Sequence, residues 1–394
     1  MYQIPKTMQA VVYRGPRDLR LETVPVPRIG RDELLVKVAV CGVCPTDIKK
    51  IHYGTVPPPR VFGHETAGTV VRTGALVRQF KVGDRVALHH HVPCLKCHGC
   101  RHHAFAQCTQ YKRTGITAAF EPAGGGYAEY VRVMPIVLAG VVKIPARNSF
   151  IEGAMLEPVN TVLKAVKRLA LLRDDTVLVA GQGPIGLMFT RLLALRGMRV
   201  IATDLLQTRL DLARQFGAEA VVRPVPQAGL DLGPGVGGSE TAAPAAETPG
   251  RLSWGRRKAA TPHGSEPGGL AGLVWRLTHG RGLDAAVLAV PSDAVMREAQ
   301  NLVRGGGQVL LFSHTRRGDH ASVDLATVCV DEKDLIGSYS ADVRLQAQVA
   351  RLVFSRKLDT RRLVTHQFAL ADTAAAVELA AHPTASSLKI VVTQ

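Results

Sequence analysis

The chain has 394 residues, 46% hydrophobic and 21% charged, which is the composition of a globular protein with room for two domains. Its formal charge of +17 would suit nucleic acid, anionic lipid or a phosphorylated ligand, but the basic residues are spread along the chain without a run of five. No basic stripe is interleaved with aromatic residues and no apolar segment reaches membrane-spanning length, so we expect neither a nucleic-acid nor a membrane partner.

The first 150 residues or so predict a β-rich domain. Short apolar segments alternate with turns marked by Gly and Pro, a pattern typical of a compact domain built from strands. The predicted strands are residues 34–40, 67–71, 83–88 and 127–133.

Two motifs in this region bring together residue types that bind a catalytic metal. "VCPTD" supplies Cys44 and Thr46, and "GHETAG" supplies His64 and Glu65. One Cys, one His, one carboxylate and a water would form a zinc site with an open position for a substrate. A single Cys or His is more often part of the core, so this interpretation depends on the motifs that follow.

A four-cysteine motif follows at residues 93–110. Cys94, Cys97, Cys100 and Cys108 have the spacing C-x2-C-x2-C-x7-C, and four thiolates this close together form a closed tetrahedral zinc site. An iron–sulfur cluster is conceivable, but its motif would normally place a Pro after a ligand Cys. A redox C-x-x-C would begin a helix of a thioredoxin-like unit, and none is predicted here. We predict a structural zinc.

The second half of the chain predicts a parallel α/β sheet. A helix is expected over residues 152–172, and apolar strands then alternate with amphipathic helices. The predicted strands are residues 176–181, 199–203, 218–222, 284–290 and 307–313. The segment at about 224–268 breaks the pattern, because it is rich in Gly, Pro, Ala and Thr and has almost no periodic apolar residues. We expect it to be a disordered insertion.

The first strand and helix of this sheet carry a dinucleotide-binding motif. Gly181, Gly183 and Gly186 form G-x-G-x-x-G, in which the glycines allow the tight turn, the approach of a pyrophosphate and close helix packing. Asp204 ends the next strand, where its carboxylate would bind both ribose hydroxyls and repel a 2′-phosphate. NAD is therefore predicted in preference to NADP. We assign three further residues to this site: Pro184, Ile185 and Arg209.

Together these motifs resemble the zinc-dependent medium-chain alcohol dehydrogenase family, nearest its sorbitol and threonine dehydrogenase branch. The motifs are "VCPTD", "GHETAG", the four-cysteine lobe, "GQGPIG" and "THGRGLD", and they cover nearly the whole chain apart from the insertion. The resemblance implies an α/β protein with a GroES-like catalytic domain at 1–153 and a Rossmann domain at 154–337. Residues 338–394 would return to the catalytic domain.

The resemblance also implies roles for individual residues. Cys44 and His64 would bind a catalytic zinc, with Glu157 of "LEPVNT" as third ligand, directly or through water. Glu65 would be the nearby acid that exchanges onto the metal, and Thr46 would take the proton from the alcohol. Relatives often carry a relay histidine where this chain has Lys49, so the later part of the relay is open.

We therefore predict a dehydrogenase that transfers hydride between an alcohol or polyol and NAD, with two zinc ions per chain. A homodimer or homotetramer is expected. Seven cysteines are too few for a disulfide scaffold and no signal peptide is apparent, so we expect a cytoplasmic location.

Two alternative functions are that of a zinc-free reductase of the same superfamily and that of a basic zinc-lobed protein that binds nucleic acid or a partner. The sequences of the loops that would line the pocket do not identify a substrate, so polyols, amino alcohols and simple alcohols all remain open.

Overall fold

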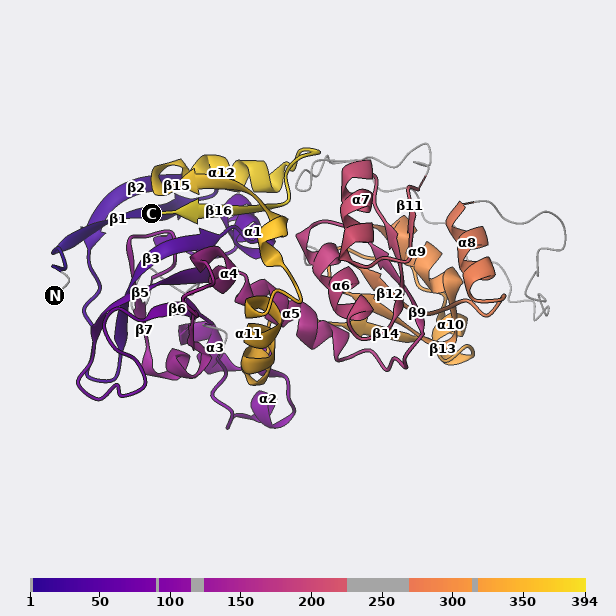
Figure 1. Cartoon of the computed structure of the whole chain (residues 1–394), viewed down its shortest axis with the longest axis horizontal. Coiled ribbons are helices and arrows are strands. Elements are labelled where there is room, and N and C mark those ends of the chain that lie inside the picture. The colour runs from indigo at the N-terminus through magenta and orange to yellow at the C-terminus, as the bar shows by residue number, and fades with distance from the viewer. Residues whose placement is uncertain (1–2, 90–91, 115–123, 225–268, 314–317) are drawn as a thin grey trace.

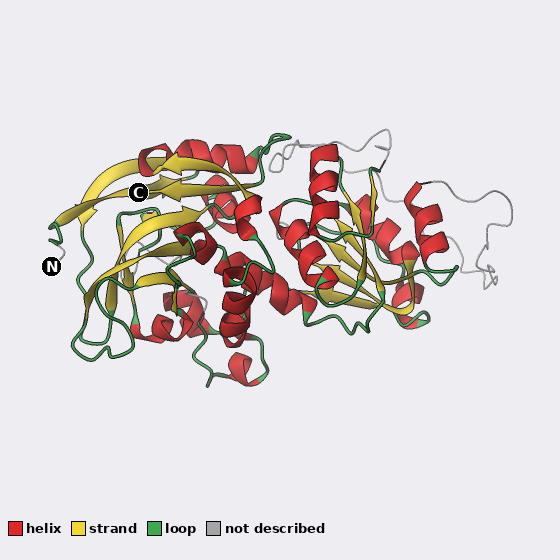
Figure 2. Ribbon diagram, viewed as in Figure 1, coloured by secondary structure: helices red, strands yellow, loops and turns green. Residues whose placement is uncertain are grey.

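The computed structural model describes residues 3–89, 92–114, 124–224, 269–313 and 318–394. Apart from its first residue, the insertion predicted at 224–268 lies outside the described residues. The elements form two bodies joined by helices, one dominated by antiparallel strands and the other by a sheet flanked by helices (Figures 1 and 2).

The first body contains the predicted β-rich domain. A three-stranded sheet has the order β2-β1-β4, and a larger sheet has the order β15-β16-β3-β5-β6-β8, with β7 paired to β3. The strands from the first half of the chain are β1 (Thr7–Gly15), β2 (Asp18–Pro25), β3 (Leu34–Gly42), β4 (Arg60–Val61), β5 (Glu65–Thr73), β6 (Arg85–Leu88), β7 (Tyr130–Val133) and β8 (Val142–Lys143). The short helices are α1 (Pro45–Tyr53), α2 (His98–Arg101) and α3 (Thr109–Thr114).

The C-terminal segment completes this body. Strands β15 (Val364–Ala369) and β16 (Lys389–Thr393) join the larger sheet, where β16 runs antiparallel to β3. Helix α12 (Thr373–Ala381) connects them, and α11 (Gln346–Phe354) precedes them. In Figure 1 β15, β16 and α12 lie against the N-terminal strands, although more than 300 residues separate them along the chain, whereas α11 lies beside α5 (Leu156–Val166).

The second body is a six-stranded parallel sheet with the order β11-β10-β9-β12-β13-β14. Because the order reverses between β9 and β12, this is the doubly wound arrangement of a dinucleotide-binding domain. Its strands are β9 (Thr176–Ala180), β10 (Arg199–Thr203), β11 (Ala220–Val222), β12 (Leu283–Leu288), β13 (Val303–Leu311) and β14 (Asp334–Gly337). Its helices are α6 (Pro184–Ala194), α7 (Gln207–Phe216), α8 (Gly269–Leu277), α9 (Asp293–Leu302) and α10 (Leu325–Cys329). The predicted fold class is confirmed.

The single helix predicted over 152–172 is wrong in its extent. The segment forms α4 (Phe150–Ala154) and α5 (Leu156–Val166), which meet at Met155. Pro158 has no N–H to donate to the carbonyl of Ala154, so a continuous helix would lose a hydrogen bond there, whereas Pro is tolerated in the first turn of α5. Ser149 and Glu152 form a capping box that starts α4.

One hydrophobic core runs through both bodies. It contains Val40 and Ala67 of the larger sheet, Val159 and Leu163 of α5, and Val177 of the parallel sheet. Because apolar burial is continuous through α5, this helix has a fixed place between the two sheets. Of the helices described, none combines the length and the apolar character needed to span a membrane.

Candidate functional site

Three side chains converge where β3 ends and β5 begins, in the middle of the larger sheet. Cys44 lies between β3 and α1, His64 directly precedes β5, and Glu65 begins β5. The pairing of β3 with β5 places Gly42 opposite Glu65, so the register brings these elements together. The ligand atoms of Cys44, His64 and Glu65 all lie within 4.8 Å of one another. A thiolate, an imidazole and a carboxylate at this spacing are a donor set that suits zinc.

The Thr46 hydroxyl lies beside this cluster. Its Oγ1 is 3.0 Å from Cys44 Sγ and 3.5 Å from His64 Nε2. The hydroxyl is both a donor and an acceptor, so it can pass a proton at the point where a metal-bound alcohol would lie.

Asp47 orients His64, a role that the sequence analysis missed. Asp47 Oδ2 is 2.9 Å from His64 Nδ1 and 3.3 Å from the backbone nitrogen of Gly63. Burial lowers the pKa of His64, but the charges of Asp47 and Cys44 raise it well above its usual range. A carboxylate on Nδ1 leaves Nε2 as the metal-binding nitrogen. The signal in the sequence was the acid in the first turn of α1, within "VCPTD".

Lys389 is the second residue that the sequence analysis missed. Its Nζ lies 2.5 Å from Glu65 Oε2 and 2.6 Å from Oε1, and it donates to the carbonyl of Val43 at 2.7 Å. Gly42 makes room for the acid, because a Cβ there would meet Glu65 Oε2 at 1.9 Å. Lys389 lies in β16, and nothing in its local sequence distinguishes it from an ordinary strand lysine.

Glu157 is buried in the first turn of α5 but is not one of the three clustered ligands. Its charge acts on one of them. Burial raises the pKa of Glu65, the charge of Lys389 lowers it, and the charge of Glu157 raises it.

Lys49 follows Thr46 by three residues on α1, so the two side chains lie on neighbouring positions of one helix face. Lys49 is half-buried, and burial lowers its pKa while the charge of Asp319 raises it. A lysine with a lowered pKa exchanges protons more readily near neutral pH.

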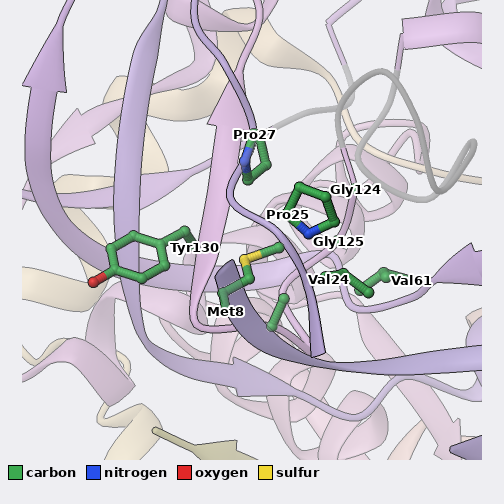
Figure 3. A pocket seen from close by; sticks show the side chains of 9 residues that line it. Met8, Val24, Pro25, Pro27, Val61, Gly124, Gly125 and Tyr130 are labelled. Carbon is green, nitrogen blue, oxygen red and sulfur yellow. The ribbon is translucent and has the colours of Figure 1, made fainter. Parts of the chain in front are cut away.

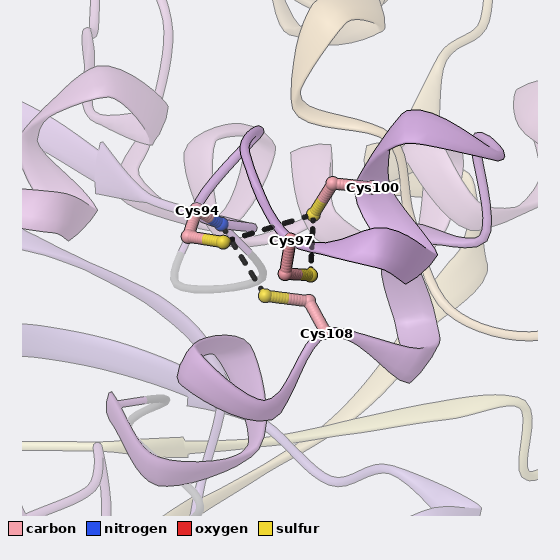
Figure 4. Close-up of side chains that lie close together, drawn as sticks. All are labelled: Cys94, Cys97, Cys100 and Cys108. Atoms are coloured by element: carbon pink, nitrogen blue, oxygen red, sulfur yellow. Dashed lines mark hydrogen bonds between the residues drawn. The ribbon is translucent and has the colours of Figure 1, made fainter.

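The four cysteines of the lobe form a second cluster (Figure 4). Their sulfur atoms all lie within 4.8 Å, with Cys97 Sγ 3.4 Å and Cys94 Sγ 4.0 Å from Cys100 Sγ. Four sulfurs bound tetrahedrally at 2.3 Å would be separated by about 3.8 Å, so this set fits one zinc ion. N–H groups of Lys96 and Cys97 lower the pKa of Cys94 to about 6, which favours the thiolate.

The predicted glycine turn joins β9 to α6. Gly181 has φ +89°, which a residue with a side chain rarely adopts, and a Cβ on Gly186 would meet the carbonyl oxygen of Gly181 at 1.8 Å. A Cβ on Gly183, by contrast, would meet nothing within 4 Å. Pro184 and Ile185 begin α6, whose N-cap Gly183 provides no side-chain cap. The open N-terminus fits a phosphate group.

Asp204 closes the other side of this turn. Its Oδ2 accepts a hydrogen bond from the Gln182 backbone at 2.6 Å, and its Oδ1 accepts one from Leu206 at 2.9 Å. Arg209 of α7 lies 3.9 Å from the same carboxylate and donates to the carbonyl of Ser387. The acid is thus held at the ends of β9 and β10, where a ribose would lie against it.

A small hollow in the first body is lined by no Cys, His, Asp or Glu among the described residues (Figure 3). It lies among Met8, Val24, Val61 and Tyr130, and its volume is about 20 Å³, enough for roughly one water molecule. A substrate would not fit there.

The chain is similar to dehydrogenases of known activity. Residues 30–146 match the alcohol dehydrogenase GroES-like domain family. Sorbitol dehydrogenase of Bacillus subtilis (strain 168) is 27% identical over 400 residues, covering 99% of this chain and 98% of the relative. D-arabinitol dehydrogenase 1 of Uromyces fabae is 28% identical over 93% of this chain and 91% of its own. The structure of acetophenone reductase from Geotrichum candidum in complex with NAD shares the fold, with a TM-score of 0.76, 23% identity and coverage of 100% and 99%.

Proposed function

Because this chain belongs to the zinc-dependent medium-chain alcohol dehydrogenase family, in its sorbitol dehydrogenase-like branch, and is an oxidoreductase of alcohols or polyols, we propose that its catalytic centre is the cluster of Cys44, His64 and Glu65. The observation that carries this proposal is the convergence of these three ligand atoms within 4.8 Å, beside the Thr46 hydroxyl. Zinc would supply Lewis acidity to a CH–OH group, and NAD would accept the hydride.

Three residues would hold the zinc in this proposal, the third of them directly or through water. Cys44 Sγ and His64 Nε2 would bind the ion, with Asp47 fixing the imidazole. Glu157 is the third ligand, directly or through water. Lys389 holds the Glu65 carboxylate, which can exchange onto the metal when that ion pair loosens.

The proton leaves along α1. Thr46 takes the proton of the alcohol, because its hydroxyl is next to both zinc ligands. Lys49 then occupies the relay position and delivers the proton towards solvent, which its lowered pKa supports.

The cofactor site takes NAD in preference to NADP. Gly181, Gly183 and Gly186 admit the pyrophosphate at the start of α6, and Pro184 and Ile185 shape the first turn. The Asp204 carboxylate is already held by two backbone N–H groups and repels a 2′-phosphate. Cys94, Cys97, Cys100 and Cys108 would hold a second zinc, which would keep the lobe folded and bring the total to two zinc ions per chain.

The chain divides into a catalytic domain at 1–153, a cofactor domain at 154–337 and a returning segment at 338–394. We propose a cytoplasmic enzyme without a nucleic-acid or membrane partner, which the seven free cysteines support.

We also propose that the chain forms a homodimer or a homotetramer. Within the described ranges β14 ends the parallel sheet without a further strand beside it. Leu325 of the neighbouring α10 is 76% exposed, and Val330 directly after this helix is 77% exposed. An open strand edge beside exposed apolar residues favours pairing with a second copy. Val330→Asp should shift the mass in solution, measured by light scattering, towards the monomer. Leu172→Asp changes an equally exposed leucine elsewhere and should leave the mass unchanged.

The activity is tested by mixing the protein with NAD and a panel of polyols, amino alcohols and secondary alcohols, and following absorbance at 340 nm. We expect NADH formation with at least one polyol, loss of this activity after zinc removal by a chelator, and recovery on adding zinc. An absence of turnover with every alcohol, in protein shown to hold zinc, would contradict the proposed function.

A further inference from the structure

A groove of about 1010 Å³ lies between the cysteine lobe, α5 and the ends of β13 and β14. Its walls include Phe105 of the lobe, Lys164 of α5, Phe312 after β13 and Tyr339 after β14. Since ligands of a doubly wound sheet bind at the carboxyl ends of its strands, the groove opens where the reacting end of a dinucleotide would lie.

The charge of the groove is strongly positive. Four cationic side chains line it, those of Lys164, Lys167, Arg168 and Arg344, against the single carboxylate of Asp342. That carboxylate is already paired with Arg344 at 2.7 Å.

Lys164 of α5 and the two cations directly after this helix, Lys167 and Arg168, retain donors that could bind an anion. Lys164 donates to the carbonyl of Tyr339 at 2.7 Å, and Arg168 donates to the carbonyl of Gly337. Each uses one of several donors in these contacts. The Lys167 side chain is exposed and makes no hydrogen bond or ion pair with the described residues, and only its backbone N–H donates, to the carbonyl of Leu163. Burial lowers the pKa of Lys164, Asp342 raises it and Arg168 lowers it, so the two neighbouring cations repel each other.

The same helix face connects these cations to the candidate catalytic centre. Lys164 follows Glu157 by seven residues, two turns along α5, which places the two positions on one face about 10 Å apart. Tyr339 gives a second connection. Burial raises the pKa of its hydroxyl, and the charges of His64, Cys44 and Glu157 also act on it. The position of Lys164 on the face of Glu157 is therefore the geometric link between the groove and the candidate catalytic centre.

We propose that the groove binds the anionic end of the substrate, so that the preferred substrate is an alcohol or polyol carrying a phosphate or carboxylate group several carbons from the reacting CH–OH. This inference rests on the proposed function and specifies its substrate class. Lys167 and Arg168 bind the anion at the mouth of the groove, and Lys164 binds it nearer the metal cluster. Lys164, Lys167 and Arg168 give the substrate class, because Arg344 is already paired with Asp342 whereas a neutral polyol would leave these three cations without a paired carboxylate.

The test compares matched substrates. Initial rates of NADH formation are measured with sorbitol, sorbitol 6-phosphate and gluconate, at low and high NaCl, for the unmodified enzyme and for Lys167→Glu and Arg168→Glu. Lys37→Glu is the control, because Lys37 is exposed on β3 outside the groove and the charge change is the same. Thermal unfolding of each variant confirms that it is folded, and Lys167→Gln repeats the test without a new negative charge.

We expect kcat/KM for at least one anionic substrate to exceed that for sorbitol by tenfold or more at low salt, and the ratio to fall as NaCl rises. The ratio should fall at least tenfold in Lys167→Glu and Arg168→Glu and stay constant in Lys37→Glu. The phosphate and carboxylate arms identify which anion is preferred. A kcat/KM for sorbitol equal to or above the values for both anionic substrates would overturn the inference. So would a ratio of anionic substrate to sorbitol that stays unchanged in both Lys167→Glu and Arg168→Glu. If no alcohol of any charge is oxidised, the proposed function itself fails.

Discussion

Lys389 and Glu65 lie 324 residues apart in the sequence and form a fully buried ion pair beside the candidate zinc ligands. The pair joins the last strand of the chain to the strand that begins at the metal cluster. The C-terminal segment therefore completes the first body and also supplies the cation that pairs with an acid of the candidate metal cluster.

Lys389→Met should destabilise the protein by about 3–5 kcal/mol, because it leaves the Glu65 carboxylate buried without its cation. Chemical denaturation measures the loss. Adding Glu65→Gln to Lys389→Met should recover part of it, since no unpaired charge then remains. If the free energy of unfolding of Lys389→Met lies within about 1 kcal/mol of that of the unmodified protein, the pair contributes little to stability.

Asp47→Asn should weaken zinc binding at the catalytic cluster by about 10–100-fold, because an amide replaces the carboxylate on His64 Nδ1. Competition with a chromogenic chelator measures the affinity directly. Asp84→Asn is the matched control, since Asp84 is paired with Lys143 in the same body, outside both metal clusters. Equal zinc affinity in both variants would argue against an orienting role for Asp47.

The two cysteine sites should respond differently to loss of one thiolate. Cys44→Ser is expected to abolish turnover and leave the fold intact. Cys97→Ser should lower the free energy of unfolding by about 4 kcal/mol or more, because a metal that supports folding is lost. Metal analysis should give two zinc ions in the unmodified chain and one in each variant. Cys329→Ser, exposed and outside both clusters, is the control. Full activity with a single zinc per unmodified chain would refute the assignment.

Asp204→Ser should lower kcat/KM for NAD by about tenfold or more, since hydrogen bonds to a charged group are worth about 1.5–3 kcal/mol. The same change should raise kcat/KM for NADP, because the repulsion of the 2′-phosphate is removed. Asp211→Ser removes a neighbouring exposed acid of α7 and should leave the ratio of the two cofactors unchanged. Equal use of NAD and NADP by the unmodified enzyme would contradict the prediction.

Much of the site was predictable from the sequence because its parts are local. The four cysteines span fifteen positions, and the glycine turn spans six, so short-range spacing already constrains which atoms can meet. Strand patterns also predicted β3, β5, β6 and β7 of the larger sheet and five of the six strands of the parallel sheet, because burial on one or both faces gives periodic apolar residues. The three-stranded sheet and the C-terminal strands β15 and β16 were not predicted. The prediction failed at Met155, where a missing N–H at Pro158 divided one apolar helical pattern into two helices.

The sequence by itself determined the residue types of both zinc clusters, the dinucleotide turn and the class of fold, because each depends on contacts between near neighbours or on periodic burial. Only the tertiary structure decided that Lys389 neutralises Glu65, that Asp47 lies on His64, and that Lys164, Lys167 and Arg168 face one groove with Arg344. The pairing of β16 with β3 and the packing of α5 between two sheets bring such residues together. Spacing along the chain carries no information about those distances, because chain reversals and sheet register set them.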